Sequence, residues 1–390
     1  MEPTVDTACD CVIVGAGPAG AYLGYLLARA GIDVIIIDKQ RFPRDKVCGG
    51  GVSRKAIDLL EFGIDEAVQC RIRGAVLTYG NQGAIIKDVE PAIGCTVLRS
   101  EFDQLLVGKA VAASARFLPE TAFIDARDDG RSLVVATTRG ELRCRRLFGA
   151  DGANSVVRDR MFGKHLVRYV PSLEALVHLD PQTLDGFGER AVFDFAAMTN
   201  GYGWIFPKRD HVNVGVYSPV GGKALRRQLD GFMACYRSLE RPLRVGYRGA
   251  VIPLRNLHDQ YQRGRVMLLG DAAGLAEAIF GEGIYFALKS ATLAARAVVE
   301  RGIDGAGDRY AQLVTGELRP ELAAARRMAA LIYRFPRLAF RHLVLNERVN
   351  DDFAGLISGA IGYRRCLIKT LVGLPAWLRP RSMPQTSLRL

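Results

Sequence analysis

Three glycines near the start of the chain have a spacing that can bind phosphate. Gly15, Gly17 and Gly20 follow a short apolar run in a GxGxxG pattern. In this pattern the first glycine permits a tight turn after a strand, the second lets the backbone approach a pyrophosphate, and the third allows close helix–strand packing. The helix that follows directs its N-terminus at the phosphates, where its dipole favours negative charge. Asp38 comes eighteen residues after Gly20, where a carboxylate can accept the ribose hydroxyls of an adenosine.

The surrounding residues predict the elements that would position this dinucleotide site. Residues 12–14 and 34–37 are short β-branched runs that predict buried strands, and residues 20–30 predict a helix between them. The strand–helix–strand order is one βαβ unit, the context in which the glycine pattern is informative.

The rest of the chain alternates between helical and strand-like patterns. We predict a helix over 102–115, two antiparallel strands over 131–148 and many short strands over 161–260. A buried strand over 266–269 leads into a helix over 281–300, and the chain after Glu317 is helical with breaks at Pro336 and Pro375.

This order predicts an α/β protein whose cofactor domain is discontinuous. Nucleotide-binding signals recur near residues 15, 151 and 271, with strand-rich segments between them. We expect a Rossmann-type domain formed by residues 1–70, 99–160 and 266–318. An inserted, mostly antiparallel β-sheet domain that binds the substrate would comprise residues 71–98 and 161–265, and residues 319–390 would form a basic helical region.

Two more segments indicate which dinucleotide is bound. Gly270, Asp271 and Gly274 follow the predicted strand over 266–269, and a helix opens with Gly281, Gly283 and Ile284. This arrangement resembles the second FAD fingerprint of the p-hydroxybenzoate-hydroxylase-like flavoproteins. The resemblance implies that Asp271 binds the ribitol chain and that the glycine-rich helix start approaches the flavin, where its dipole would stabilise an anionic reduced flavin.

Two shorter motifs of the same superfamily lie between these segments. Asp151 and Gly152 resemble its Asp-Gly motif, and Arg99 matches its arginine near the pyrophosphate. The four motifs occur in the superfamily's order, so we expect non-covalently bound FAD as the redox centre.

A narrower resemblance, to the geranylgeranyl reductase family, covers nearly the whole chain. Residues 38–56, which include Lys39, Cys48 and Gly49, resemble the segment that follows the second strand in that family. Residues 281–290 resemble its chlorophyll-pathway members. The Tyr-x-Trp-x-Phe-Pro substrate motif of the family is matched by Tyr202, Trp204, Phe206 and Pro207. The resemblance implies reduction of C=C bonds in a geranylgeranyl-type chain of a lipid, quinone or chlorophyll-type molecule.

The aromatic motif also has a physical reading of its own. Alternate residues of a strand point to one face, so Tyr202, Trp204 and Phe206 would form one aromatic wall. An isoprenoid chain has no polar handle and must be bound by apolar surface, at about 25 cal/mol for each Å² buried. The same rings could instead be ordinary sheet core.

Cys48 lies in a glycine-rich turn that lets the backbone come close to a planar cofactor. The family resemblance places the matching cysteine beside the isoalloxazine. No second cysteine lies four or five residues away, which excludes a redox disulfide of the lipoamide-dehydrogenase kind. Cys48 could shape the pocket, assist protonation or be a packing residue.

The expected reaction needs a hydride at one alkene carbon and a proton at the other. An isolated alkene accepts hydride poorly, so the pocket must protonate or polarise it. Cys48, Tyr202 and a water molecule are the candidate proton donors. The expected catalytic residues are Cys48, Tyr202 and Trp204. There is one dinucleotide fingerprint, and FAD would use it. NADPH or NADH would therefore have to dock transiently on the flavin to reduce it, or a protein such as ferredoxin would supply the electrons.

Two departures from the family pattern affect the pocket. Thr199 stands where most members have proline, and Glu277-Ala278 stands where many have Asp-Pro or Asn-Pro. Two other functions therefore remain open. One is a flavin monooxygenase or halogenase, although Tyr202 and Phe206 break the halogenase Trp-x-Trp-x-Ile-Pro motif. The other is a non-enzymatic FAD-binding protein of the membrane surface.

Charge and cysteine usage bound the remaining choices. The net charge is +12, and the residues from Arg319 onward hold thirteen Lys/Arg against four Asp/Glu. Apolar residues lie between these cations, and they include Phe335, Leu338, Phe340, Leu343 and Trp377. They favour an anionic membrane surface over nucleic acid, although solvated ordinary helices would look similar. None of the eight cysteines forms a CxxC or a zinc-type cluster, so we expect no metal. We expect a cytoplasmic protein, free or peripheral on the inner face of the membrane.

Overall fold

The βαβ unit predicted around the first glycines is present in the computed structural model, which describes residues 8–88, 90–164, 166–219, 224–255, 260–341 and 347–377. Strand β1 (Ala8–Val14) pairs in parallel with β2 (Val34–Ile37), and helix α1 (Pro18–Arg29) connects them. All four residues of β2 are buried, as expected for a parallel strand covered on both faces.

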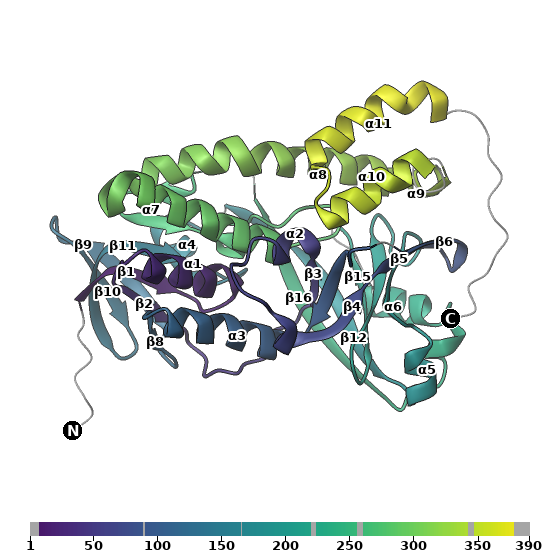
Figure 1. Ribbon diagram of the computed structural model, residues 1–390, viewed down its shortest axis with the longest axis horizontal. Coiled ribbons are helices and arrows are strands. Elements are labelled where there is room, and N and C mark those ends of the chain that lie inside the picture. Colours follow the sequence, from purple (N-terminus) through teal and green to yellow (C-terminus); the bar gives the residue numbers. More distant parts are fainter. Residues whose placement is uncertain are drawn as a thin grey trace.

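The first sheet extends this unit with strands from distant parts of the chain. Its order is β17-β18-β11-β1-β2-β8, and β9 and β10 continue from β11. The bounds are β8 (Arg116–Leu118), β9 (Phe123–Asp128), β10 (Leu133–Thr137), β11 (Gly140–Gly149), β17 (Gln262–Arg263) and β18 (Val266–Leu268). The antiparallel pairing of β10 and β11 confirms the hairpin predicted over 131–148. Helices α3 (Arg99–Ala112) and α7 (Ile284–Leu313) pack against α1 (Figure 1), and the short α4 (Val156–Met161) follows β11.

The second sheet has the order β16-β12-β15-β14-β13-β5-β6 and is antiparallel except where β13 meets β5. Its strands are β5 (Gly74–Tyr79), β6 (Gln82–Asp88), β12 (Val167–His178), β13 (Arg190–Asp194), β14 (Tyr202–Pro207), β15 (Val212–Tyr217) and β16 (Arg244–Arg255). One face buries Ile205, Val214 and Val216 in an apolar cluster shared with α6 (Leu225–Met233). Short helices lie beside this cluster at Pro181–Asp185 (α5) and Arg237–Leu239 (η2). The opposite face carries the aromatic motif of β14.

A small third sheet lies between the two larger ones. It is antiparallel, in the order β3-β7-β4, with β3 (Gly51–Ser53), β4 (Val68–Ile72) and β7 (Gly94–Val97). The helix α2 (Arg54–Ile57) follows β3, and a 3-10 turn, η1 (Asp65–Ala67), precedes β4. Its strand β3 directly follows the Cys48 turn, and its strand β4 is followed by β5 of the second sheet.

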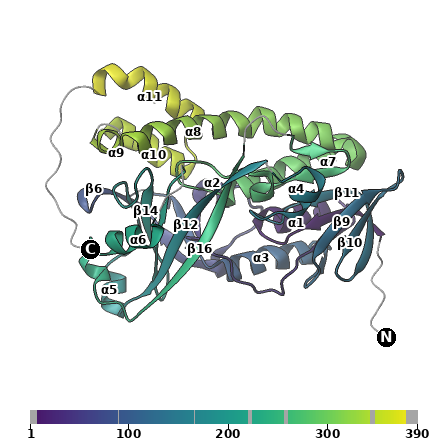
Figure 2. The same cartoon turned by 180° about the vertical axis from the view of Figure 1, so that it is seen from behind.

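The C-terminal region is helical, as predicted. A π-helical segment, η4 (Val314–Leu318), links α7 to α8 (Arg319–Arg334), followed by α9 (Pro336–Ala339), α10 (Glu347–Ser358) and α11 (Tyr363–Trp377). These helices lie beyond one end of α7, on the side of the second sheet (Figures 1 and 2). Among the described residues, no helix is long and apolar enough to cross a membrane.

Three helix boundaries test the predictions. The helix expected to end at residue 300 ends close to that point, because α7 consists of two helical segments that meet at a non-helical Gly302, with φ +66° and ψ 169°. Glycine adopts this conformation without steric cost, so the chain kinks there and the second segment runs to Leu313. The break expected at Pro336 is confirmed, because α8 ends at Arg334 and α9 begins at Pro336. The break expected at Pro375 is wrong, because that residue lies in the last turn of α11.

Candidate cofactor and substrate site

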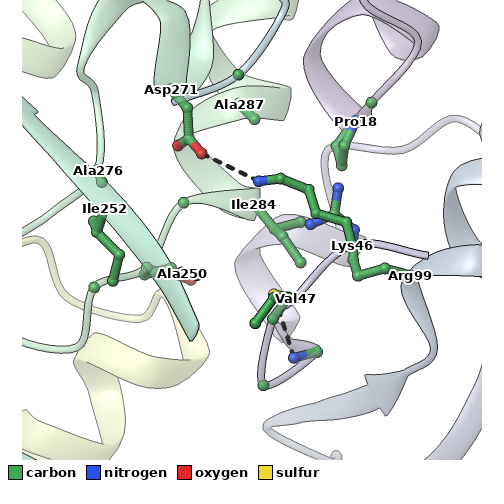
Figure 3. A pocket seen from close by; sticks show the side chains of 18 of the residues that line it. Pro18, Lys46, Val47, Arg99, Ala250, Ile252, Asp271, Ala276, Ile284 and Ala287 are labelled. Atoms are coloured by element: carbon green, nitrogen blue, oxygen red, sulfur yellow. Dashed lines mark hydrogen bonds and ion pairs between the residues drawn. The ribbon is translucent and has the colours of Figure 1, made fainter. Parts of the chain in front are cut away.

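A single cavity of about 610 Å³ collects residues from all three sheets and from the C-terminal helices. Figure 3 shows it from close by, with Pro18 and Arg99 on one side and Ala250 and Ile252 on the other. Most of the residues singled out from the sequence line it, and these are Gly15, Gly17, Asp38, Lys39, Cys48, Gly49, Arg99, Asp151, Gly152, Tyr202, Trp204, Phe206, Asp271, Gly281, Gly283 and Ile284. Gly20 and Pro207 do not line it.

The glycine pattern forms the turn that its spacing predicted. Gly15 has φ +99°, and a Cβ there would lie 2.4 Å from the backbone oxygen of Ala150. A Cβ at Gly20 would lie 1.8 Å from the oxygen of Gly15, so this glycine serves helix–strand packing instead of the cavity. Helix α1 begins immediately after Gly17 without a side-chain cap, which leaves its first N–H groups free to bind an anion.

Two guanidinium groups stand opposite this helix end. The nearest atoms to a Cβ at Gly17 would be the Nη2 atoms of Arg44 and Arg99, at 3.5 and 3.9 Å. Both arginines pair with the fully buried carboxylate of Asp103, Arg99 through two hydrogen bonds of 2.8 Å and Arg44 through an ion pair of 2.8 Å. The Arg44 contact lacks hydrogen-bond geometry, and its buried Nη1 has no hydrogen-bond partner. Two cations sharing one carboxylate leave net positive charge at the helix end.

Asp38 ends β2 with its carboxylate fixed by the backbone. One oxygen accepts a hydrogen bond from the N–H of Ala16 and the other from the N–H of Gln40, both at 2.9 Å. Each oxygen keeps a lone pair for a further donor, so the arrangement is compatible with the predicted contact to ribose hydroxyls.

The Asp-Gly motif has a structural task at its own helix. The carboxylate of Asp151 accepts hydrogen bonds from the hydroxyl of Ser155 and from the N–H groups of Val156 and Val157. These bonds satisfy free donors in the first turn of α4. Gly152 follows with φ +80°, a conformation that turns the backbone along the cavity wall.

At the other end of the cavity, Asp271 faces the start of α7. Its carboxylate lies 3.6 Å from the Nζ of Lys46, a contact drawn in Figure 3. A Cβ at Gly283 would lie 3.2 Å from the Oδ1 of Asp271, so only glycine lets the chain pass this close without displacing the carboxylate. Helix α7 begins at Ile284 without a side-chain cap, and its free N–H groups therefore face the cavity together with Asp271.

A buried lysine that the sequence did not single out, Lys208, fixes the backbone of the Cys48 turn. The Nζ of Lys208 donates hydrogen bonds of 2.9 Å to the backbone oxygens of Gly49 and Val97. Burial lowers the pKa of Lys208 to about 8. The Sγ of Cys48 accepts a weak hydrogen bond of 3.4 Å from the N–H of Gly50, which keeps the half-buried thiol at the cavity wall.

The aromatic wall inferred from strand alternation is formed by β14. The ring centroids of Tyr202 and Trp204 are 5.9 Å apart, and those of Trp204 and Phe206 are 6.2 Å apart. The wall lies against the Cys48 turn, because a Cβ at Gly49 would approach the Nε1 of Trp204 to 3.0 Å. The hydroxyl of Tyr202 donates a 2.7 Å hydrogen bond to the backbone oxygen of Phe280.

Behind this wall lies a polar group that the sequence did not reveal. Trp204 Nε1 donates a 2.7 Å hydrogen bond to the Oδ1 of Asn213 on β15. The side chain of Asn213 in turn interacts with the carboxyl group of Glu174 on β12. Glu174 lines the cavity, although only 3% of its surface is exposed. Burial raises the pKa of Glu174 above the usual range of a glutamic acid.

The C-terminal helices reach the cavity next to Lys55 of α2. Its Nζ forms a 2.7 Å ion pair with Glu282, next to the start of α7. It also approaches the backbone oxygen of Leu356 at 3.3 Å and the hydroxyl of Tyr363 at 3.4 Å. Leu356 and Tyr363 line the cavity, so α10 and α11 wall part of the same space as the predicted flavin site.

Glu277, one of the departures from the family pattern, shapes the loop before α7. Its fully buried carboxylate accepts hydrogen bonds from the N–H groups of Ile279, Phe280 and Glu282. Burial, assisted by the charge of Glu282, raises the pKa of Glu277 to about 7. An acidic residue without a following proline can therefore close this loop through the backbone.

Away from the cavity, one group of described residues has metal-type ligands in proximity. His178, Asp210 and His211 hold ligand atoms within 4.8 Å of one another. The Nε2 of His178 lies 2.9 Å from a guanidinium nitrogen of Arg244, which places a cation next to the group. None of the three residues lines the cavity.

The donor set of the cavity fits FAD. An uncapped helix end beside two guanidinium groups suits a pyrophosphate, and the Nη2 atoms of Arg44 and Arg99 lie on the side of Gly17. The Asp38 carboxylate suits a ribose, and Asp271 with the uncapped start of α7 suits the opposite end of an extended dinucleotide. Glycines keep the backbone open at both ends.

Comparisons with known proteins agree with this geometry. Residues 8–167 match the family model of the FAD binding domain. Menaquinone reductase of Mycolicibacterium smegmatis is 30% identical over 84% of this chain and 85% of its own length. Geranylgeranyl diphosphate reductase of Rhodobacter capsulatus is 30% identical over 74% of this chain and 75% of its own.

Solved structures share the fold. A geranylgeranyl bacteriochlorophyll reductase-like protein of Thermoplasma acidophilum superposes with a TM-score of 0.74 at 19% identity, covering 94% of this chain and 96% of that one. The halogenase PltM in complex with FAD superposes with a TM-score of 0.70 at 14% identity, covering 93% and 85%. At these identities the structures establish the architecture, whereas the sequence relatives establish the family.

Proposed function

Since this chain belongs to the geranylgeranyl reductase family of FAD-dependent oxidoreductases, which act on CH–CH groups, we propose that it reduces C=C bonds in a geranylgeranyl-type isoprenoid chain. The chain could be the side chain of a lipid, a quinone or a chlorophyll-type molecule. One observation carries the proposal: the aromatic wall of β14 lines the same cavity as the FAD-binding motifs. An apolar substrate and the cofactor would therefore meet in one space.

The cofactor-binding residues divide between the two ends of the cavity. Gly15, Gly17, Arg44 and Arg99 would hold the pyrophosphate, and Asp38 with its neighbour Lys39 the adenosine ribose. Asp271 and the backbone from Gly281 to Ile284 would hold the ribitol and the flavin. When bound and reduced, the cofactor supplies the hydride for alkene reduction.

The chain's own contribution is to bind and orient the prenyl group. Tyr202, Trp204 and Phe206 offer apolar surface along one edge of the cavity, and Leu356 with Tyr363 closes another part of the wall. The Cys48 turn, fixed by Lys208, lies against Trp204. A reacting double bond would thus be held between the turn and the aromatic wall. The enclosure also excludes water.

The reductant that charges the flavin would be NADPH, NADH or a ferredoxin-type protein. The sequence has a single dinucleotide motif, which FAD would occupy. This supports a donor that docks transiently and argues against a permanent nicotinamide site. Anaerobic reduction of the purified protein by each donor in turn, followed through the bleaching of flavin absorbance, separates the three.

Mass spectrometry tests the proposed substrate class. Host lipids and quinones with and without the gene should differ by two hydrogens, or a multiple of two, in one prenylated compound. Purified protein should saturate the same compound anaerobically when supplied with a reductant. Oxygen consumption coupled to hydroxylation or halogenation of a substrate, without any change in prenyl saturation, would favour the monooxygenase or halogenase alternative instead.

We also propose that the C-terminal helices rest on an anionic membrane. Exposed apolar side chains occur on α8, α9 and α11 and in their connections, at Leu331, Phe335, Leu338, Ile368 and Leu371. Exposed arginines accompany them at Arg334, Arg337, Arg364 and Arg365. Basic and apolar side chains together suit the interface of an anionic bilayer.

Part of the predicted membrane face is wrong. Phe340 is buried, and its ring packs near those of Tyr79 and Phe195. Leu343 and the side chain of Trp377 fall outside the described residues. The proposal therefore rests on the exposed residues of α8, α9 and α11, whose region also walls the cavity through Leu356 and Tyr363.

A further inference from the structure

The second sheet presents a buried carboxyl group beside the aromatic wall. In the strand register, Trp204 of β14 stands opposite Gly215 of β15, and Gly215 stands opposite Glu174 of β12. Directly paired residues of neighbouring strands point to the same face. Trp204 and Glu174 therefore belong to one row that faces the cavity, with a residue lacking a side chain between them.

Gly215 makes room for the indole ring of Trp204. A Cβ at this position would lie 2.0 Å from the Cζ2 of Trp204. The indole thus lies over Gly215, and its Nε1 reaches the Oδ1 of Asn213 at 2.7 Å. Because the oxygen of the Asn213 amide is engaged by the indole, its NH₂ group is the part that faces Glu174.

The groups around the Glu174 carboxyl are donors and cations. The Asn213 side chain and the backbone N–H of Cys48 lie near it and favour its charged form. The charged neighbours are Lys208 at the end of β14 and Arg248 of β16, and Arg248 is itself paired with Asp45. Donors and cations cannot accept a proton. A neutral Glu174 that lines the cavity beside such neighbours can direct its proton at a bound substrate.

Of the proton donors considered from the sequence, Tyr202 is less well placed than Glu174. Its hydroxyl donates a 2.7 Å hydrogen bond to the backbone oxygen of Phe280, and burial raises the pKa of this phenol well above its ordinary value. The Cys48 sulfur accepts a hydrogen bond of 3.4 Å from the N–H of Gly50, which leaves its S–H free. Cys48 is therefore the alternative donor, and variants of Glu174 distinguish the two.

We propose that Glu174 is the general acid of alkene reduction, an inference that rests on the proposed function. Saturation of one C=C adds a hydride to one carbon, supplied by the reduced cofactor with two electrons from a nicotinamide- or ferredoxin-class donor. The other carbon takes the proton of the Glu174 carboxyl as its new C–H bond forms. The resulting carboxylate then regains a proton from solvent. Asn213 and the Cys48 N–H position the carboxyl and stabilise its charge after transfer.

Burial supports this role because it keeps the acid protonated to higher pH. Desolvation raises the pKa of Glu174, while the bonds from Asn213 and Cys48 and the nearby cations oppose the rise. A general acid must be protonated before the step, so the rate of proton transfer should fall as pH rises through the pKa of the folded protein.

The test compares FAD-loaded Glu174→Gln, Glu174→Asp and a control, Glu141→Gln, which removes an exposed carboxylate from β11. FAD content and the rate of flavin reduction by the donor should match the wild type in all three. Anaerobic reoxidation of the reduced enzyme by a geranylgeranyl compound that carries no quinone ring should slow by about 10²–10⁴-fold in Glu174→Gln. Glu174→Asp, which keeps a carboxyl one methylene shorter, should recover part of the rate.

Infrared spectroscopy gives a readout that needs no turnover. The resting protein should show a protonated-carboxyl C=O band that titrates above the ordinary glutamate range and is missing from Glu174→Gln. Reoxidation of Glu174→Gln at the wild-type rate and with the wild-type pH profile would overturn the assignment of Glu174 and leave the proposed function standing. Wild-type reduced enzyme that no prenyl compound reoxidises would overturn the proposed function itself.

Discussion

The indole N–H of Trp204 donates a 2.7 Å hydrogen bond to the side-chain oxygen of Asn213, its neighbour across β14 and β15. This bond fixes the ring over Gly215 and against the Cys48 turn. The residue that the sequence assigned to an apolar wall is therefore also oriented by a polar contact, and the two roles can be separated by mutation.

Trp204→Ala should impair turnover of long prenyl substrates while FAD content stays at the wild-type level. The change removes a ring that is 7% exposed, at a cost to folding stability of about 3–5 kcal/mol. Trp204→Phe, which keeps a ring but loses the N–H, should have a smaller effect. Steady-state kinetics on a geranylgeranyl compound measure the difference. Wild-type kinetics in Trp204→Ala would show that Trp204 is only a packing residue of the sheet.

Gly215→Ala tests whether the indole of Trp204 lies over Gly215. An added Cβ would lie 2.0 Å from the Trp204 ring, so the indole must move and its bond to Asn213 should break. We expect a higher KM for the prenyl substrate and an altered tryptophan fluorescence, with flavin still bound. Gly231→Ala on α6, where a Cβ would meet no atom within 4 Å, is the matched control. An unchanged KM and emission spectrum in Gly215→Ala would contradict the packing described.

Asp271→Ala should lose most of the flavin on purification. The ribitol would lose its carboxylate acceptor, and Lys46 would lose the partner that lies 3.6 Å away. Asp271→Asn, which retains a side-chain oxygen, should keep more flavin, and the exposed Asp304→Ala should keep all of it. Wild-type protein should be yellow and release intact FAD on heating. The assignment of Asp271 fails if the alanine variant purifies fully loaded.

Glu277 should make the folded protein less stable as pH rises. Its pKa is about 7 in the folded protein, against an ordinary 4.5. Between these values the folded state retains a proton that the unfolded chain has released, so stability present below pH 4.5 is lost as pH approaches 7. The loss amounts to roughly 1.4 kcal/mol for each pH unit.

Urea unfolding of the FAD-saturated protein at pH 5 and pH 7.5 measures this loss. Glu277→Gln should reduce the difference between the two pH values, whereas the exposed Glu141→Gln should leave it unchanged. Equal pH dependence in wild type and Glu277→Gln would show that the carboxyl is ionised throughout, stabilised by the N–H groups of Ile279, Phe280 and Glu282.

The sequence predicted the parts of this site that depend on near neighbours. Gly15, Gly17 and Asp38 lie within one βαβ unit, and the wall of Tyr202, Trp204 and Phe206 follows from alternation within one strand. Local periodicity suffices for such features, because it determines which face a side chain takes without reference to the rest of the chain.

Long-range pairing explains what was missed. Glu174 becomes a candidate acid only when the register places it opposite Gly215 and, through it, Trp204. Lys55 meets Leu356 across 301 residues of chain. Helical periodicity likewise could not tell that Phe340 faces the core, since that depends on the position of Tyr79 and Phe195.

The C-terminal helices should bind anionic vesicles and release them in salt. From Arg319 onward there are thirteen Lys/Arg against four Asp/Glu, and Phe335 and Leu338 are 51% and 52% exposed beside Arg334 and Arg337. Each cation contributes about 1 kcal/mol at most near an anionic surface, and salt screens this attraction. We therefore expect a peripheral attachment, from which a lipid-borne prenyl chain could reach the cavity without crossing water.

Liposome flotation decides between a membrane surface and ordinary solvated helices. The full chain should float with anionic vesicles but not with neutral ones, and less so at high salt. The double variant Arg364→Glu/Arg365→Glu, on the exposed side of α11, should float less. Arg131→Glu/Arg160→Glu makes the same charge change near the first sheet and should float like the wild type. Equal loss in both double variants would show that net charge alone governs binding, and equal flotation with both vesicle types, or none with either, would leave α8, α9 and α11 as ordinary solvated helices.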